Sequence, residues 1–366
     1  MTIHPLHSIC PYFAMFPPEF VERYVLAFSN PGDIVFDPFC GRGTAIFESL
    51  LLERYAYGMD INPVAACVSG AKAAPPTLAN VIRRIRRLRE EFTLSEASSV
   101  PDSEFFKLCY SPRTLSQICF LRERLEWRLS KVDRFVAATA LGCLHGESHR
   151  TENCFSNRMP RTISTKPDYS VKWWRANGLE PPDRDVFQIL ERQAQYRYKQ
   201  GVALLEGRAS LGDVRSASSV FRSLKARVNL VITSPPYLDT TDYGEDQWLR
   251  LWFLGGLERP KARQFSDGRH SSESRYWAFI ESSWRGIANL LASECVIVVR
   301  IGGTAFDAEQ IRSGLNRTMR AGFKSRNVTE VEPISSSEIK NRQTNAFRPG
   351  TKGQRLEHDY VVRVKS

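Results

Sequence analysis

The chain has 366 residues, of which 42% are hydrophobic and 25% are charged, a composition that is ordinary for a soluble globular protein. It contains no run of about 18 apolar residues, so we expect no transmembrane helix and no membrane partner. The N-terminus lacks a basic segment followed by an apolar one, so we expect no secretory signal and a cytoplasmic location. The formal net charge of +11 indicates a polyanionic partner, most simply a nucleic acid.

The first 75 residues predict an α/β unit. A helix is expected over residues 17–29, and a short apolar strand over 34–39 leads into the glycine-containing stretch CGRGT. Helical periodicity follows the glycines, and a second short strand ends at Asp60. A strand, loop, helix and strand in this order favour a parallel sheet with a right-handed crossover.

Residues 76–204 differ because helical periodicity dominates them. Residues 151–184, rich in Pro, Ser, Asn and basic residues, predict an irregular segment. Amphipathic or long helices are expected over residues 78–92, 113–132, 134–146 and 185–207.

The α/β pattern resumes after residue 205. Strands are expected over 228–233, 294–303 and 358–364, and helices over 246–257, 274–291 and 307–322. The predicted fold class is therefore α/β, with one doubly wound sheet and a mostly helical insertion. Residues 1–75 and 205–366 would form the sheet domain, and residues 76–204 the insertion.

The strand at 228–233 ends in the stretch Ser234-Pro235-Pro236-Tyr237. Two adjacent prolines remove two backbone donors and fix φ, so neither a helix nor a sheet continues there. A rigid polar corner at the carboxyl end of a parallel strand is a place where a ligand can be held.

Gly41 and Gly43 mark the turn from the first strand into a helix. Glycine lets the backbone approach a ligand closely, and a helix N-terminus offers unpaired N–H groups. Asp60, at the end of the next strand, has the acceptors that ribose hydroxyls need. The third glycine of a GxGxxG dinucleotide site is missing here, and a structural turn without a ligand is the alternative.

Together, the stretches DPFCGRGT, MDINP, GDVR and TSPPY resemble the motifs of S-adenosylmethionine-dependent DNA amino-methyltransferases of the N4-cytosine or N6-adenine type. The resemblance spans most of the chain. It implies a Rossmann-like methyltransferase sheet, S-adenosyl-L-methionine as cofactor, double-stranded DNA as partner and, as one option, a separately acting restriction endonuclease. It assigns to the cofactor the residues Phe16, Asp37, Pro38, Phe39, Gly41, Gly43, Thr44, Asp60, Ile61 and Asp213.

The resemblance also implies how the Ser-Pro-Pro-Tyr corner acts. The Ser234 hydroxyl and the Pro235 carbonyl would accept hydrogen bonds from an exocyclic amine, on a rigid frame completed by Pro236. Tyr237 would stack on a base rotated out of the duplex, and the methyl group would transfer directly and in line. Serine at the first position is typical of N4-cytosine enzymes, with N6-adenine as the alternative. The chain has no Pro-Cys dipeptide, which argues against C5-cytosine chemistry.

The insertion carries the candidate nucleic-acid surface, because one stretch interleaves basic and aromatic residues. The arginines at positions 83–89 could also contact nucleic acid, but the alternative is a solvent-exposed helix face on which they pair with acidic residues. The candidate contacts are Arg158, Arg161, Lys166, Tyr169, Lys172, Trp173 and Trp174.

No metal is predicted. The chain has eight cysteines and no CxxC pair, so we expect reduced, buried thiols. Cys143, His145, His149 and Cys154 lie close in sequence, but their spacing does not match the common zinc patterns.

Three other functions remain open on sequence grounds. An RNA amino-methyltransferase would have the same basic surface. A nucleic-acid-binding module without activity would keep the fold. A protein glutamine methyltransferase is disfavoured by Ser234 and by the positive charge.

Overall fold

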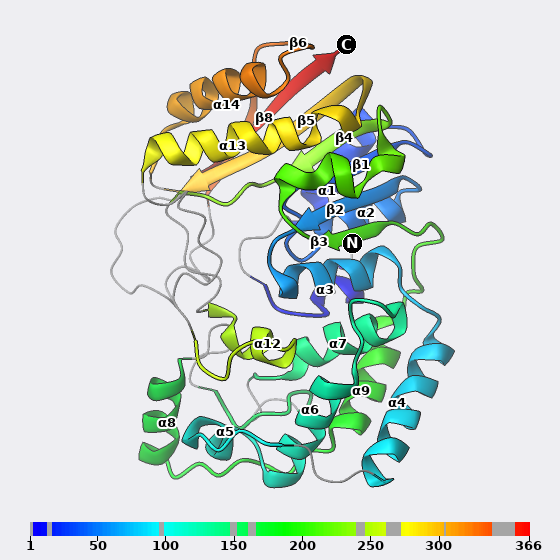
Figure 1. The fold of residues 1–366 in the computed structure, drawn as a ribbon, viewed down its shortest axis with the longest axis vertical. Coiled ribbons are helices and arrows are strands. Elements are labelled where there is room, and N and C mark those ends of the chain that lie inside the picture. Colours follow the sequence, from blue (N-terminus) through cyan, green and yellow to red (C-terminus); the bar gives the residue numbers. More distant parts are fainter. Residues whose placement is uncertain are drawn as a thin grey trace. The chain divides into compact units, whose positions relative to one another are not determined.

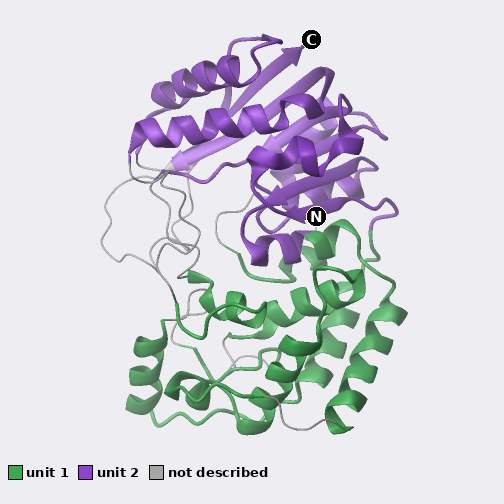
Figure 2. Ribbon diagram, in the orientation of Figure 1, with its two compact units in different colours: residues 1–12, 70–202, 242–264 green, residues 13–69, 203–241, 265–366 purple. Residues whose placement is uncertain are grey.

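The computed structural model divides the chain into two compact units, a sheet unit and a helical unit (Figure 2). The sheet unit comprises residues 13–69, 203–241 and 265–366, and the helical unit comprises residues 1–12, 70–202 and 242–264. The sequence had assigned residues 1–12 and 242–264 to the sheet domain. The structure describes residues 3–12, 17–94, 99–146, 152–159, 166–238, 246–260, 272–303, 305–338 and 356–366.

The sheet unit contains an eight-stranded sheet in the order β3-β2-β1-β4-β5-β8-β6, with β7 paired to β8 (Figure 1). Strands β1 to β5 pair in parallel, and β8 pairs antiparallel with β5. The strands are β1 Ile34–Asp37, β2 Tyr55–Asp60, β3 Arg208–Leu211, β4 Val228–Thr233, β5 Leu291–Gly303, β6 Asn327–Val328, β7 Glu332–Glu338 and β8 Leu356–Lys365.

Alternate residues of these strands face opposite sides of the sheet, as the two-residue period of a strand requires. One side packs on helices α1 (Pro18–Phe28) and α2 (Thr44–Leu51). The other packs on α13 (Glu273–Ile287) and α14 (Ala308–Gly322), which lie across β5 and β8 in Figure 1. Both faces are covered, so the predicted doubly wound α/β fold is confirmed.

The strand order reverses between β1 and β4. The chain runs outward from β1 to β2 and β3, then returns to β4 on the other side of β1 and continues to β5. In open parallel sheets, the carboxyl ends of the strands at such a switch point form a ligand-binding crevice. Asp37, Asp60 and Thr233 end strands β1, β2 and β4 at this edge.

The helical unit packs around aromatic side chains. Phe105 lies 5.4 Å from Trp174 and 5.0 Å from Trp248, and Phe106 lies 4.5 Å from Trp252, all between ring centroids. Its elements are η1 Pro5–Ser8, α4 Leu78–Leu94, α5 Glu104–Cys109, α6 Pro112–Arg124, α7 Lys131–Cys143, α8 Pro167–Ala176, α9 Val186–Arg197 and α12 Trp248–Phe253. Helix α3, Pro63–Ala73, contains the boundary between the units.

Several elements differ from the sequence prediction. Helix α9 ends at Arg197 and not near residue 207, and Gly201 follows in the left-handed region with φ of 77°. Helix α8 lies in the stretch predicted to be irregular, with Pro167 in its first turn, where a missing N–H does least harm. Three short helices were also not predicted: η2 Val214–Ser216, α10 Ala217–Val220 and η3 Arg222–Leu224. The end of the helix predicted over 274–291 is the short helix η5, Ala288–Leu290.

Among the described residues, no helix combines the length and apolar character that crossing a bilayer requires.

Candidate active site and nucleic-acid surface

A buried hydrogen bond joins the two strands at the switch point. The Thr233 hydroxyl donates to Asp37 Oδ1 over 2.9 Å, and the Phe39 backbone N–H donates to the same oxygen over 3.1 Å. Asp37 is only 2% exposed, and this burial raises the pKa of its carboxyl to about 7. Asp37 therefore ties the end of β1 to the end of β4, the strand that leads into the Ser-Pro-Pro-Tyr corner.

The glycine loop is held by the carboxylate of Asp60. Asp60 Oδ2 accepts the Gly41 backbone N–H over 2.9 Å, and Oδ1 accepts the Asn62 backbone N–H over 2.9 Å. Gly43 has φ of 75°, and a Cβ there would lie 2.7 Å from the Ser69 Cβ on helix α3. Glycine at position 43 is therefore required both by backbone conformation and by the close approach of α3.

The residues around this loop fit a nucleoside-like cofactor. Each carboxylate oxygen of Asp60 keeps acceptor capacity after one backbone bond. Next to Asp60, the Ile61 side chain is apolar and 39% exposed. An exposed apolar side chain in this position could pack against the adenine ring of a nucleoside. Helix α2 begins after Gly43, which has no side chain and makes no side-chain cap hydrogen bond to the first turn. The N-terminus of a helix in this position favours an anionic or polar ligand.

The remaining cofactor candidates take different environments. Thr44 and Pro38 are buried, and the Phe39 ring is half-buried, 5.8 Å from that of Phe279. Asp213 follows β3 and accepts the Arg215 backbone N–H over 2.9 Å, with the Arg215 guanidinium also bound to its carboxylate. Phe16 lies outside the described residues.

The Ser-Pro-Pro-Tyr corner is tied down by its tyrosine. The Tyr237 ring is 7% exposed and belongs to the core cluster that faces α13. Its hydroxyl donates to Glu357 Oε1 over 2.9 Å and accepts from the Ser234 hydroxyl over 3.3 Å. Burial first, and then the Glu357 charge, hold the pKa of Tyr237 well above its ordinary value.

This burial corrects one expectation from the sequence. A ring that is 7% exposed cannot stack on a flipped base in this conformation. Ser234 is half-buried, and its hydroxyl remains next to the Tyr237 hydroxyl. Pro235 is buried and Pro236 half-buried, as a rigid corner requires.

Sequence reasoning missed the charged group next to this corner. Arg300 on β5 binds Asp359 on β8 through two hydrogen bonds of 2.6 and 2.9 Å, and its guanidinium lies 3.9 Å from the centroid of the Phe20 ring. Arg300 Nη1 also reaches Glu357 Oε2 over 3.4 Å. The sequence did contain a signal for this ion pair, because β5 and β8 each place charged residues within or next to apolar runs, and a buried charge needs a partner.

In the helical unit, the arginine-rich helix α4 is mostly neutralised. Arg84 binds Asp133 on α7 over 2.8 Å, and Arg87 binds Glu91 within α4 over 2.9 Å. Arg86 and Arg89 pair with Glu191 and Asp185, next to or within α9. The arginines of α4 thus pair with acids, as the alternative explanation expected, but most of these acids lie on or next to other helices and not on α4 itself.

Helix α8 presents a different basic surface. Tyr169 is 50% exposed, Lys172 is exposed and Trp173 is half-buried. Lys172 and Trp173 lie three and four positions after Tyr169, so each of them is a neighbour of Tyr169 on the helix surface. The guanidinium of Arg158, also exposed, lies 5.6 Å from the Trp173 ring centroid. We call these four residues the α8 surface.

Two predicted contacts do not join the α8 surface. Trp174 is fully buried, and its Nε1–H donates to the Arg158 carbonyl over 2.5 Å. It therefore cannot contact nucleic acid in this conformation and serves the core of the helical unit. Lys166 is half-buried before the first turn of α8, and Arg161 lies outside the described residues.

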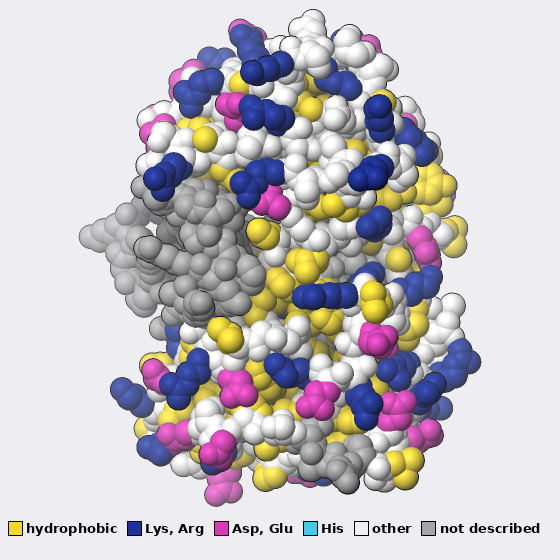
Figure 3. All heavy atoms as spheres, in the orientation of Figure 1, with side chains coloured by type: hydrophobic (Ala, Val, Ile, Leu, Met, Phe, Trp, Pro, Cys, Tyr) yellow, Lys and Arg dark blue, Asp and Glu magenta, His cyan; other side chains and the backbone are white. Residues whose placement is uncertain are grey.

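Basic side chains are spread widely over both units. On the face shown in Figure 3, Lys and Arg side chains lie over the sheet unit and the helical unit, with acidic side chains between them. The charge excess is therefore not concentrated in one patch on this face.

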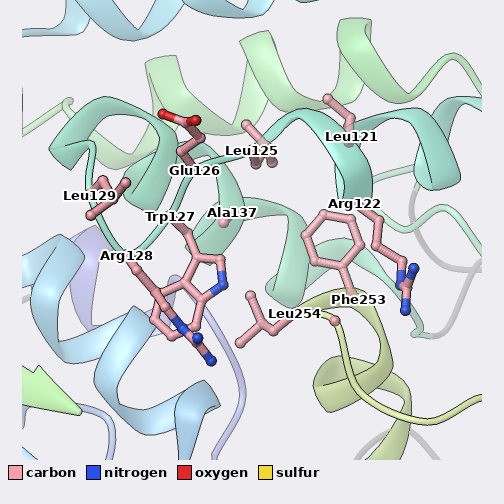
Figure 4. A pocket seen from close by; sticks show the side chains of 11 residues that line it. Leu121, Arg122, Leu125, Glu126, Trp127, Arg128, Leu129, Ala137, Phe253 and Leu254 are labelled. Carbon is pink, nitrogen blue, oxygen red and sulfur yellow. The ribbon is translucent and has the colours of Figure 1, made fainter.

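A pocket of about 500 Å³ lies within the helical unit (Figure 4). Its lining is mostly apolar and includes Trp127 and Phe253. Arg122 donates to the Trp252 carbonyl over 2.8 Å, and the Arg128 guanidinium lies 5.1 Å from the Trp127 ring centroid. Both arginines are thus engaged by the pocket's own walls, and we assign the pocket no ligand.

The cysteine and histidine cluster is buried. Cys143, His145 and Cys154 are each less than 5% exposed, and His149 lies outside the described residues. Across the described ranges, no group of three or more His, Cys, Asp or Glu side chains is arranged to hold a metal ion. Burial raises the pKa of Cys143 to about 12, so its thiol stays protonated.

Residues 4–68 match the family model of N6 and N4 methyltransferases, described as DNA methylase. The match is confined to residues 4–68, and over these residues the chain is similar to the DNA amino-methyltransferase family. The matched residues include the glycine loop and Asp60, whereas Ser234 lies beyond them. The match supports S-adenosyl-L-methionine, the cofactor that the sequence predicted.

Two similar proteins are Type II methyltransferases. The Type II methyltransferase M.MjaII of Methanocaldococcus jannaschii is 34% identical over 67 residues, 18% of this chain and 13% of that protein. The Type II methyltransferase M.MvaI of Kocuria varians is 24% identical over 264 residues, 66% of this chain and 56% of that protein. Both alignments cover less than two thirds of these relatives.

Among solved structures, the rRNA methyltransferase aviRa from Streptomyces viridochromogenes aligns with 98% of this chain and 90% of its own. Its TM-score is 0.36 and its sequence identity is 14%. The description of the fold therefore rests on the strand order of this chain and not on this likeness.

Proposed function

We propose that this methyltransferase acts on DNA and transfers a methyl group from S-adenosyl-L-methionine to the exocyclic N4 of cytosine. The observation that carries the proposal is the hydrogen bond between Thr233 and Asp37. It joins the strand that leads into Ser234 to the strand that leads into the glycine loop. The acceptors for an amine and the loop for the cofactor therefore start from adjacent strand ends.

The cofactor would be held at the carboxyl edge of the sheet. Gly41 and Gly43 would bring backbone close to it, and Asp60 would accept hydrogen bonds from ribose hydroxyls. Ile61 would contact the adenine ring, and Asp213 its amino group. When bound, the cofactor supplies a methyl group on a positively charged sulfur.

The corner would prepare the amine. The nitrogen lone pair of an exocyclic amine is delocalised into the ring, which makes the nitrogen a poor nucleophile. Hydrogen bonds from its two N–H groups to the Ser234 hydroxyl and the Pro235 carbonyl would localise that pair, on a frame that needs no reorganisation. A nitrogen held in this way would accept the methyl group that the cofactor supplies; the carbon–sulfur bond would break with its electron pair left on sulfur, and one N–H proton would leave to solvent.

The base would reach the corner by rotating out of the duplex, since its amino group is inaccessible to a protein pocket while the base is stacked. Serine at position 234 favours cytosine over adenine, because Asp or Asn is usual there in adenine enzymes. The α8 surface would contact the DNA backbone and so position the duplex. A separately acting restriction endonuclease with the same target site completes the proposal.

The test is product identification. Purified protein is incubated with labelled S-adenosyl-L-methionine and unmethylated genomic DNA, and the digested nucleosides are analysed by mass spectrometry. We expect N4-methylcytosine, lost in Ser234→Ala and retained in Ser219→Ala, a control at an exposed serine of the same unit. N6-methyladenine would overturn the base assignment and keep the mechanism.

Two other outcomes would overturn the substrate or the activity. Methylation of RNA alone would contradict the DNA substrate. Calorimetric binding of S-adenosyl-L-methionine without any product on DNA or RNA would indicate a module without activity.

A further inference from the structure

A chain of hydrogen bonds leads from the proposed catalytic hydroxyl to a carboxylate on another strand. Ser234 donates to the Tyr237 hydroxyl over 3.3 Å, a long contact, and Tyr237 donates to Glu357 Oε1 over 2.9 Å. Glu357 lies on β8, 120 positions from Tyr237 in sequence. No motif of the corner includes it.

The carboxylate of Glu357 determines the direction in which these hydrogen bonds are donated. An ionised carboxylate only accepts hydrogen bonds, so the Tyr237 hydroxyl must use its single proton toward Glu357. The Tyr237 oxygen then accepts the Ser234 proton. A hydroxyl has one donor and two acceptor lone pairs, so Ser234 is left with acceptors only on its other side.

The carboxylate is itself held in place. Arg300 Nη1 lies 3.4 Å from Glu357 Oε2, and Arg300 is fixed by its two bonds to Asp359. Asp359 also accepts the Ser335 hydroxyl over 2.6 Å. Burial alone would lower the pKa of Arg300, but the bonds to Asp359 and the charge of Glu357 raise it above its ordinary value, so the guanidinium stays charged.

The backbone opposite Glu357 makes room for it. Gly302 pairs with Glu357 across β5 and β8, and a Cβ at Gly302 would lie 2.7 Å from the Glu357 Cγ. Any other residue at position 302 would displace this side chain. Geometry, charge and space thus converge on one placement of the carboxylate.

We propose that Glu357 is a positioning residue for methyl transfer, which acts through Tyr237 to aim the acceptor lone pairs of Ser234 at the substrate amine. This inference rests on the proposed function, since it supposes that Ser234 meets the amine. In it, Tyr237 orients the hydroxyl and does not stack on the base. Arg300 and Asp359 fix the far end of the chain.

The decisive experiment is a double-mutant cycle between Glu357→Gln and Ser234→Ala, with single-turnover rates and S-adenosyl-L-methionine affinity as readouts. Glutamine has nearly the same shape, but its NH₂ group can donate to the Tyr237 hydroxyl. The hydrogen bonds from Ser234 to Tyr237 and from Tyr237 to position 357 could then reverse their direction. We expect Glu357→Gln to lower kcat by about tenfold or more, with KM for DNA and cofactor affinity within about twofold of wild type. In the Ser234→Ala background, the same change should alter the residual rate by less than about twofold.

The control is Glu294→Gln, the same chemical change at an exposed residue of β5, which should leave the rate unchanged. Equal losses from Glu357→Gln in both backgrounds would overturn the inference, because Glu357 would then act independently of Ser234. A loss of cofactor affinity as large as the loss of rate would also overturn the inference, because it would show that Glu357 supports the structure of the site in general.

A second measurement does not need activity. With tyrosine labelled with ¹³C at Cζ, the Tyr237 resonance is identified by its absence in Tyr237→Phe. We expect Glu357→Gln and Ser234→Ala each to move this resonance at neutral pH, and Glu294→Gln to leave it in place. An unmoved resonance would overturn the inference. An inactive wild type with the expected resonance changes would instead contradict the proposed function alone.

Discussion

The carboxyl edge of the sheet and the α8 surface use polar groups in opposite ways. At the sheet edge, Asp37 and Asp60 are fixed by hydrogen bonds to backbone and side chains of neighbouring strand ends. On the α8 surface, Lys172 and Arg158 are exposed, and Arg158 rests on an aromatic ring. Rigid placement suits a reaction, whereas exposed charge suits contact with a polyanion. Single substitutions should therefore have large effects at the sheet edge and small, additive effects on α8.

Ser234→Ala should have the largest effect. It removes an acceptor for the amine, and we expect the methyl-transfer rate to fall by about a thousandfold. Affinity for S-adenosyl-L-methionine, measured by calorimetry, should stay within about twofold of wild type. A rate within about tenfold of the Ser219→Ala control would mean that the corner does not perform the reaction.

Asp37→Asn should change how stability depends on pH. The unfolded carboxyl titrates near 3.8 and the folded one at about 7, so between these values the folded state holds a proton that the unfolded state has lost. This group's contribution to stability therefore falls as pH rises from about 4 to about 7, and the two pKa values correspond to about 4 kcal/mol. The asparagine variant lacks this titration.

The free energy of unfolding of Asp37→Asn, relative to wild type, should consequently rise by about 3 kcal/mol between pH 4.5 and pH 8. Urea denaturation at several pH values measures it. A constant difference across this range would show that the carboxyl titrates normally in the folded protein.

Gly43→Ala should weaken cofactor binding by about tenfold and lower stability by about 2–3 kcal/mol, because it combines strain with a collision. Gly178→Ala is the matched control, since Gly178 has φ of 58° and nothing within 4 Å of an added Cβ. The control should lose only about 1 kcal/mol. Equal losses in thermal denaturation would mean that Ser69 moves aside without cost.

Substitutions on the α8 surface should have the smallest effects. Lys172→Ala and Arg158→Ala should each weaken DNA binding by about threefold to tenfold, without preference for sequence, and each should lower the salt dependence of log K by about one. Arg87→Ala on α4 is the control, because Arg87 already pairs with Glu91. Fluorescence anisotropy at several salt concentrations measures both. Similar losses for Arg87→Ala would remove the distinction between α4 and α8.

The sequence was sufficient for β1, β2, β4, β5 and β8, because apolar runs mark these strands. It did not predict β3, β6 and β7, which are short or polar. The apolar runs located Asp60 at a strand end and Ser234 directly after one, whereas the predicted first strand continued past Asp37 to residue 39. It was insufficient for the burial of Tyr237, since the partner Glu357 lies on a strand far along the chain. The neutral state of α4 was likewise not readable locally, because Asp133 and Asp185 lie in or next to other helices.

Helix α8 was missed for a related reason. Its first turn contains a proline and its surroundings are polar, which locally resembles a loop. The burial of Trp174 against Phe105 stabilises the helix, and no local pattern encodes that contact.

The neighbouring strands β1 and β4 lie far apart in the sequence. The Ile34 backbone N–H donates to the side-chain oxygen of Asn229, which is 195 positions later. On the ribosome, β1 and β2 emerge before residues 70–202 of the helical unit are synthesised, and β4 follows these residues. Until β4 arrives, β1 has an unpaired edge, of the kind that recruits chaperones or other chains. Assembly of the strand ends at the switch point is thus a late step of biogenesis, and a nascent chain halted before β4 would lack the strand that leads into Ser234.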